Sequence, residues 1–159
     1  MDKSQHIFFM QEALKQAREA FSKDEVPVGA VVVYENKIIA RAHNQVELLK
    51  DPTAHAEMLA ITQAAGFLGG KWLSDCDIYV TIEPCSMCSG ALVLARIKNI
   101  FFGAKDPKTG ACGSVANIPA NKKLNHHIKV RGGVLAKDCG MLLSEFFKLK
   151  RRKEAARNN

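Results

Sequence analysis

Residues 77–102 read DIYVTIEPCSMCSGALVLARIKNIFF, in which two apolar runs flank a segment of helical length that follows Pro84. The pattern predicts a strand at 77–82, a helix at 85–95 and a second strand at 98–102. A helix between two strands in this order normally returns the chain parallel to the first strand. This stretch therefore predicts an α/β fold with at least one parallel pair of strands.

Helical and strand patterns also alternate in the rest of the chain. The predicted elements are a helix at 4–22, a hairpin of strands at 30–34 and 37–41, a helix that is capped by Asp51 or Thr53 and ends near Ala65, a strand at 127–130 and a helix at 137–156. The first hairpin strand is apolar throughout, so we expect it inside the sheet. Together these elements predict one domain over residues 1–159, with a three-layer α/β/α fold around a central mixed sheet of about five strands.

Composition excludes the fibrous, disordered and membrane-spanning classes. The chain has 159 residues, of which 47% are hydrophobic and 25% charged, and no apolar stretch reaches the length of a membrane span. The N-terminus contains no signal-peptide core, and the five cysteines are an odd number, so we expect a cytoplasmic protein with reduced thiols. The net charge of +7 favours a polyanionic partner such as nucleic acid, although a basic surface without such a partner is the simpler alternative.

Two short motifs carry the chemistry: His55-Ala56-Glu57 and Pro84-Cys85-Ser86-Met87-Cys88. Cysteines three apart at a helix start face the same side, where the helix dipole favours thiolates. We expect His55, Cys85 and Cys88 to hold one zinc ion per chain and to leave a fourth position for water, which becomes available as hydroxide at neutral pH. Glu57 can then move protons beside the metal.

Two other interpretations of these motifs are open. A Cys-x-x-Cys pair is also typical of redox sites, and a structural zinc site would need a fourth protein ligand. The candidates for that fourth ligand are His43, Cys76, Cys112, His126 and Cys139. A closed site has no need of a neighbouring acid, so Glu57 favours catalysis. The combination of His-x-Glu and Pro-Cys-x-x-Cys is the signature of zinc deaminases, in which zinc-bound hydroxide attacks the amidine carbon of a base and the glutamate shuttles protons.

The whole chain resembles the bacterial tRNA-specific adenosine deaminases, which convert the wobble adenosine of an arginine tRNA to inosine. The segments that carry the resemblance are 26–30, Asn44, 51–57, 81–88, 95–97, 102–111, 124–126 and 142–147. The resemblance implies a cytidine deaminase-like fold, a zinc-dependent deaminase domain over residues 1–159, a tRNA anticodon loop as substrate, and a homodimer whose interface includes the helix at 85–95 and Arg96.

The resemblance also implies which residues bind the substrate. The Asn44 amide and the backbones of Val26 and Ala56 would frame a flipped purine, and Asp106, Lys108 and Asn125 would contact the RNA. A carboxylate at Asp106 can accept from a ribose 2′-OH, which would distinguish RNA from DNA. Turn formation is the alternative role for Asn44 and Asp106. We expect Phe146 and Phe147 to pack in the core, although Phe147 could instead stack on a nucleotide or cover the sheet edge. Trp72 and the remaining cysteines are expected to be structural, and the basic residues 148–153 are expected to hold phosphates or simply to solvate a helix end.

Two other functions compete with tRNA deamination. The same scaffold could deaminate a free base or nucleoside, such as guanine or cytosine, which would need no basic platform. A non-catalytic, zinc-stabilised RNA-binding module would keep the metal and the charge but show no turnover.

Overall fold

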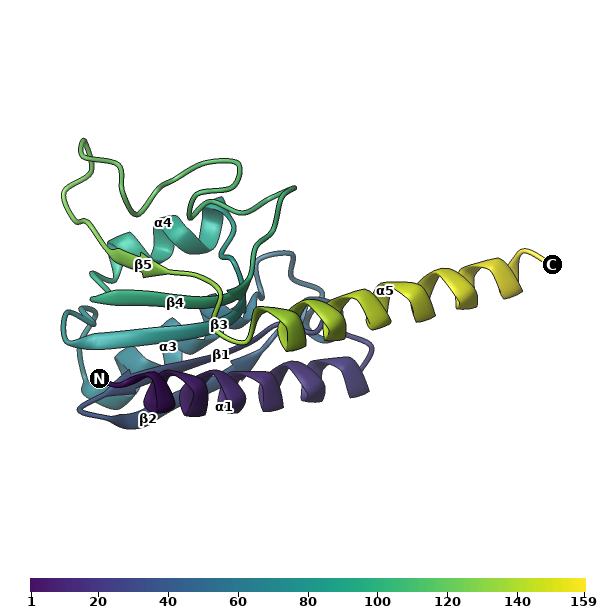
Figure 1. Ribbon diagram of the computed structural model, residues 1–159, viewed down its shortest axis with the longest axis horizontal. Helices are drawn as coiled ribbons and strands as arrows, with labels where there is room; N and C mark the ends of the chain where they lie inside the picture. The colour runs from purple at the N-terminus through teal and green to yellow at the C-terminus, as the bar shows by residue number, and fades with distance from the viewer.

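A five-stranded mixed sheet forms the centre of the computed structural model, which describes residues 1–159 (Figure 1). The strands lie in the order β2-β1-β3-β4-β5. Their bounds are β1 Gly29–Tyr34, β2 Lys37–His43, β3 Cys76–Ile82, β4 Asn99–Ala104 and β5 Lys129–Arg131. β1 pairs antiparallel with β2 and β3, whereas β3, β4 and β5 are parallel, so the predicted crossover is confirmed and the first hairpin strand is internal.

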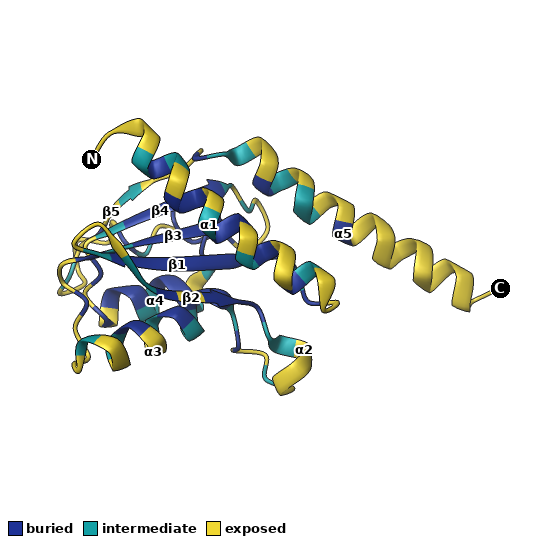
Figure 2. Ribbon diagram, turned by 90° about the horizontal axis from the view of Figure 1, so that it is seen from below, coloured by how far each residue is buried: buried dark blue, intermediate teal, exposed yellow.

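Helices cover both faces of this sheet and make the three layers that the sequence predicts. The helices are α1 Lys3–Ser22, α2 Val46–Leu49, α3 Ala56–Leu68, α4 Ser86–Leu94 and α5 Ala136–Arg157. In Figure 2, α1 and α5 lie on one side of the buried strands, and α3 and α4 lie on the other. The second half of α5 extends beyond the sheet and is exposed. No helix combines the length and the apolar character that crossing a membrane requires.

Successive side chains of β1 point to opposite faces of the sheet, so the strand contributes to two separate clusters of the hydrophobic core. Val31 and Val33 pack with α1, whereas Ala30 and Val32 pack on the side of α3 and α4. At the start of β1, a Cβ atom on Gly29 would lie 2.1 Å from the Ala13 carbonyl oxygen. Only glycine therefore allows α1 to lie so close to this strand.

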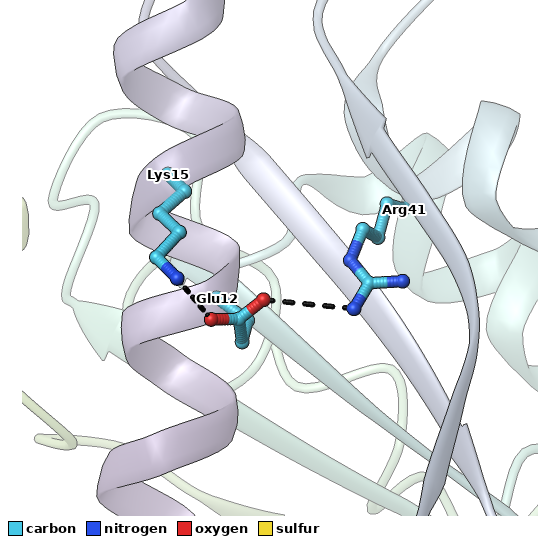
Figure 3. Close-up of polar contacts among 3 residues, drawn as sticks. All are labelled: Glu12, Lys15 and Arg41. Carbon is cyan, nitrogen blue, oxygen red and sulfur yellow. Dashed lines mark hydrogen bonds and ion pairs between the residues drawn. The ribbon is translucent and has the colours of Figure 1, made fainter.

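An ion-pair cluster joins α1 to the edge strand β2 (Figure 3). The Glu12 carboxylate contacts the Lys15 ammonium on its own helix and lies 3.6 Å from the Arg41 guanidinium on β2. Both cations are at least half exposed, so solvent screens the pairs and their contribution to stability is small.

Helix α3 differs from its prediction at both ends. Asp51 does not cap it, because its carboxylate accepts from the backbone and hydroxyl of Thr53 in a separate turn, and the helix begins after His55. It ends at Leu68, where Gly69 adopts a φ of 71°, rather than near Ala65. The short helix α2 was not predicted. Trp72 is not part of the core: it is 53% exposed, and the Arg96 guanidinium lies 4.6 Å from its ring.

Candidate active site

The first residues of two helices bring the three predicted ligands together. His55 is the N-cap of α3 and Cys85 is the N-cap of α4, and neither side chain makes a capping hydrogen bond. Cys88 lies in the first turn of α4 and is fully buried. The Nδ1 atom of His55 is 3.7 Å from the Cys85 sulfur and 3.5 Å from the Cys88 sulfur. The three ligand atoms lie within 4.8 Å of one another and could hold a metal ion.

These neighbours shift one another's protonation. A hydrogen bond from Cys88 and another from His55 lower the pKa of Cys85 to about 4. Donation to Cys85 and burial raise the pKa of Cys88 above its usual value. The hydrogen bond with Cys85 raises the pKa of His55. The metal-free pair therefore holds one thiolate and one thiol at neutral pH, and a metal ion would displace the remaining thiol proton.

Glu57 lies in the first turn of α3, next to this cluster. It is 3% exposed, and burial raises the pKa of its carboxyl, although a hydrogen bond with Cys88 opposes the shift. Burial favours the neutral form of a carboxyl, so this side chain takes up a proton more readily than an exposed one. Glu57 can therefore accept and return protons within the site.

The structure brings no fourth protein ligand to the cluster. His43 Nδ1 contacts the Asn44 carbonyl oxygen, and His126 Nε2 contacts the carbonyl oxygen of Ile97. Cys76, Cys112 and Cys139 are buried elsewhere. The arrangement is therefore an open site with three protein ligands, which is the kind that catalytic metals use.

A cavity of about 380 Å³ opens over the cluster. His55, Glu57 and Cys85 form part of its lining, and Val26, Asn44 and Asp106 also line it. Asn44 has a structural contact as well: its side-chain oxygen accepts from the Ala56 backbone N–H at 2.8 Å. The Asn44 NH₂ group stays free to donate to a ligand, whereas the Ala56 N–H is already used.

Two buried glutamates at this cavity were missed by the sequence interpretation. Glu25 accepts hydrogen bonds from the Glu47 and Leu48 backbones and so holds α2. Glu83, just before Pro84, accepts from the 106–114 segment. Burial raises the pKa of Glu83, but its hydrogen bonds outweigh burial and keep the pKa below the usual range. The residue type alone does not show that an acid is buried. The one signal in the sequence for a role of Glu83 was its position next to the Pro-Cys-x-x-Cys motif.

A second groove, of about 540 Å³, lies beside the cavity. Its lining includes four basic side chains, Lys105, Lys108, Lys148 and Arg151. Phe147 and Asp106 line both hollows. The expectation that Phe147 packs in the core is wrong, since it is 37% exposed, whereas Phe146 is buried against Phe21. Both rings line the cavity, but only Phe147 also lines the second groove, where it stays partly exposed.

The loop residues predicted to contact RNA are placed differently from one another. Asp106 holds a turn by accepting from the Lys108 and Thr109 backbones and from the Thr109 hydroxyl, and it still faces the cavity. Lys108 is exposed in the second groove. Asn125 is exposed on the loop before β5 and lines neither hollow. Within one chain, Asn125 is thus not brought to the site.

The mixed sheet, with two ligand-bearing helix starts and a buried glutamate, defines a deaminase of the cytidine deaminase-like class. Residues 3–151 match the MafB19-like deaminase family. A tRNA-specific adenosine deaminase of Bacillus subtilis (strain 168) is 47% identical over 157 residues, which are 98% of each chain.

Solved structures agree with this match. A tRNA deaminase described for A-to-I editing at the wobble position of transfer RNA is 41% identical, with a TM-score of 0.82 over 85% of this chain and 98% of that chain. A guanine deaminase from Nitrosomonas europaea is 25% identical, with a TM-score of 0.76 over 88% of this chain and 83% of that chain. The chain belongs to the family of tRNA-specific adenosine deaminases.

Proposed function

We propose that this protein hydrolytically deaminates adenosine to inosine at the wobble position of a tRNA anticodon, with an arginine tRNA as substrate. The observation that carries the proposal is the buried Glu57 beside an open three-ligand cluster, at the base of a cavity bordered by a basic groove. The full-length similarity to a tRNA-specific adenosine deaminase supports the substrate, and the arginine tRNA follows from the family resemblance alone.

The cluster fits zinc. Ligands of a tetrahedral zinc ion, with bonds of about 2.3 Å to sulfur and about 2.0 Å to nitrogen, stand about 3.6 Å apart. The two nitrogen-to-sulfur distances here are 3.7 and 3.5 Å. We therefore propose one zinc ion per chain, held by His55, Cys85 and Cys88. When bound, zinc supplies a Lewis acid that makes hydroxide available near neutral pH.

The side chains around the cavity would transfer protons and bind the base. Glu57 would take one proton of the attacking water and pass it to the ring nitrogen next to the reacting carbon. It would then take the second proton from the hydroxyl added to that carbon and give it to the departing amine, as the carbonyl forms and the carbon–nitrogen bond breaks. Adenosine and water thus give inosine and ammonia. The free Asn44 NH₂ group would donate to an acceptor on the purine, and Val26 would pack against the base.

The surroundings of the cavity are suited to RNA. Lys108 and the other cations of the second groove can bind phosphates, and Phe147 offers a ring on which a neighbouring base can stack. Asp106 keeps acceptor capacity for a ribose 2′-OH beyond the bonds within its turn. A tRNA substrate favours a location in the cytoplasm.

We also propose that the protein is a homodimer, with α4 and Arg96 at the interface. Leu94, at the end of α4, is 80% exposed, and a partner subunit that covers α4 would bury it. A second subunit could also bring Asn125 to a neighbouring site. In sedimentation velocity, we expect the wild type to be a dimer and Leu94→Glu to be a monomer.

One experiment tests the activity directly. An anticodon stem-loop of the arginine tRNA is incubated with wild-type protein or with Glu57→Ala, and the wobble nucleoside is identified by mass spectrometry. We expect inosine with the wild type and none with Glu57→Ala, while both proteins contain one zinc ion per chain. Inosine formation by Glu57→Ala would contradict the role of the glutamate, and no inosine with the wild type would contradict the proposed function.

A free-base deaminase is the second candidate, because a guanine deaminase shares the fold. The groove of basic residues argues against it, since a free base carries no phosphate. Release of ammonia from guanine, cytosine or free nucleosides as fast as from the stem-loop would establish this alternative. A binding module without catalysis would show RNA binding but no turnover on any of these substrates.

A further inference from the structure

Glu83 is the most heavily hydrogen-bonded carboxylate of the molecule, and the proposed chemistry does not use it. It lies after the last residue of β3, is 2% exposed and has no ion-pair partner. One oxygen accepts from the Asp106 backbone at 3.2 Å and from the Ser114 hydroxyl. The other accepts from the backbones of Cys112 and Ser114, each at 3.1 Å. A buried charge with no cation depends on such donors for its stability.

All four donors belong to residues 106–114, and this segment closely surrounds the carboxylate. A Cβ atom on Gly110 would lie 2.3 Å from a Glu83 oxygen and 2.5 Å from the Asp106 carbonyl oxygen, so no other residue fits there without displacement. The segment is also tied to the ligand-bearing chain, because the Ala111 backbone donates to the Pro84 carbonyl oxygen at 2.8 Å. Glu83 and its neighbours therefore fix one loop against the start of α4.

The same loop forms a wall of the cavity. Asp106 and Thr109 line it, and their side chains are joined by a hydrogen bond of 2.6 Å. Since Glu83 holds the Asp106 backbone and precedes Cys85 by two residues, it sets the separation between this wall and the metal ligands.

We propose that Glu83 is a positioning residue for the RNA: it holds residues 106–114 where Asp106 and Thr109 meet the nucleotide whose base lies over Glu57. The proposal rests on the proposed function for the identity of the ligand. Loosening the carboxylate's hold should weaken RNA binding more than it slows the chemical step, because Glu57 and the metal ligands stay in place.

Ser114 provides a mild test, since it is exposed and contributes one hydroxyl to the clamp. For Ser114→Ala we expect the KM for the anticodon stem-loop to rise about fivefold, with kcat changed less than about twofold. Ser114→Thr keeps the hydroxyl and should restore the wild-type KM. Ser74→Ala, at an exposed serine that neither contacts Glu83 nor lines the cavity, is the matched control and should leave both constants unchanged.

Hydrogen exchange tests the clamp without substrate. Amides of 106–114 should exchange faster in Ser114→Ala and in Glu83→Gln than in the wild type, while peptides of α3 keep their protection and zinc content stays at one per chain. Glu83→Gln places an amide NH₂ against backbone donors, so its KM should rise by about tenfold or more. If Glu83→Gln does not fold, the Ser114 variants decide alone.

Three results would overturn the proposal: unchanged exchange in Ser114→Ala, an unchanged KM beside altered exchange, or loss of zinc and kcat with KM preserved. The last would mean that Glu83 supports only the metal-binding segment. If the wild type fails to edit any tRNA, the proposed function fails, whereas the exchange measurement still shows whether Glu83 holds the loop.

Discussion

The side-chain oxygen of Asn44 accepts a hydrogen bond from the backbone N–H of Ala56, so one amide both caps helix α3 and faces the cavity. The two roles can be separated by substitution. Asn44→Asp keeps the acceptor but loses the NH₂ donor, whereas Asn44→Ala loses both. We expect kcat/KM on the stem-loop to fall at least about tenfold in both variants.

Only Asn44→Ala should also lose stability, by about 1 kcal/mol or more, because the buried Ala56 N–H is left without an acceptor. Urea denaturation of the two variants measures this difference. Equal stability of Asn44→Ala and the wild type would contradict the capping role.

Removal of the proposed zinc ion should abolish deamination reversibly. Because Cys88 holds its proton in the metal-free chain, we expect zinc binding near pH 7 to release at least about one proton, and the affinity to fall as the pH is lowered. Calorimetric titration in two buffers of different ionisation enthalpy counts the protons. Cys88→Ala should bind zinc poorly, and Cys76→Ala, at a buried cysteine outside the cluster, should bind normally.

Acid should destabilise the fold in part through His6. This side chain is buried against Tyr79, with its Nδ1 atom 2.8 Å from the tyrosine hydroxyl, and burial lowers its pKa. The unfolded chain therefore takes up a proton first as the pH falls below about 6.5, and stability is lost from there down to the pKa of the folded state. Above that window His6 is neutral in both states and contributes no pH dependence.

The matching experiment compares the free energy of unfolding at about pH 7.5 and about pH 5.5. The wild type should lose more stability between these values than His6→Gln, which removes the titrating group. Equal losses would show that His6 does not titrate differently in the two states.

Adjacent phenylalanines on α5 should behave in opposite ways. Phe146→Ala removes a buried ring and should cost about 3 kcal/mol of stability. Phe147→Ala should cost less than about 1 kcal/mol, yet raise the KM for the stem-loop about tenfold if a base stacks on this ring. Denaturation curves and steady-state kinetics on both variants test the pair, and an unchanged KM for Phe147→Ala would exclude stacking.

Editing should weaken with added salt, because the second groove is lined by cations. The slope of log affinity against log salt concentration is negative, and each lost phosphate contact reduces its magnitude by about 0.7 for single-stranded RNA. Lys148→Ala and Arg151→Ala should each flatten the slope by about this amount. Lys37→Ala, at the exposed first residue of β2, is the control and should change nothing.

The sequence predicted the parts that depend on periodicity and motif spacing. The crossover from β3 through α4 to β4 follows from an apolar run, a proline and a second apolar run, and the ligand cluster follows from the Cys-x-x-Cys and His-x-Glu spacings. Each of these predictions depends on residues close together in the sequence, and the tertiary structure keeps the elements that they indicate.

Other features depend on contacts that the sequence does not contain. Asp51 was expected to cap a helix, but its carboxylate instead accepts hydrogen bonds from Thr53 within a local turn. Phe147 lies off the apolar face that Phe146 occupies, yet we expected both rings in the core. Only the folded structure shows that Phe147 also lines the second groove, whereas Phe146 does not. The buried roles of Glu25 and Glu83 depend on segments distant in sequence, the short helix α2 and the 106–114 loop, whose backbone donors converge on each carboxylate.

His55 and Cys85 are the residues at which two helices begin, so the metal ligands come together only in the folded chain. Metal binding therefore adds to the free energy of unfolding. An ion that binds only the folded chain stabilises it by about 1.4 kcal/mol for every tenfold excess of free ion over the dissociation constant. The unfolded fraction of this protein would then follow the zinc supply of the cell, and a shortage would lower the amount of enzyme as well as its activity.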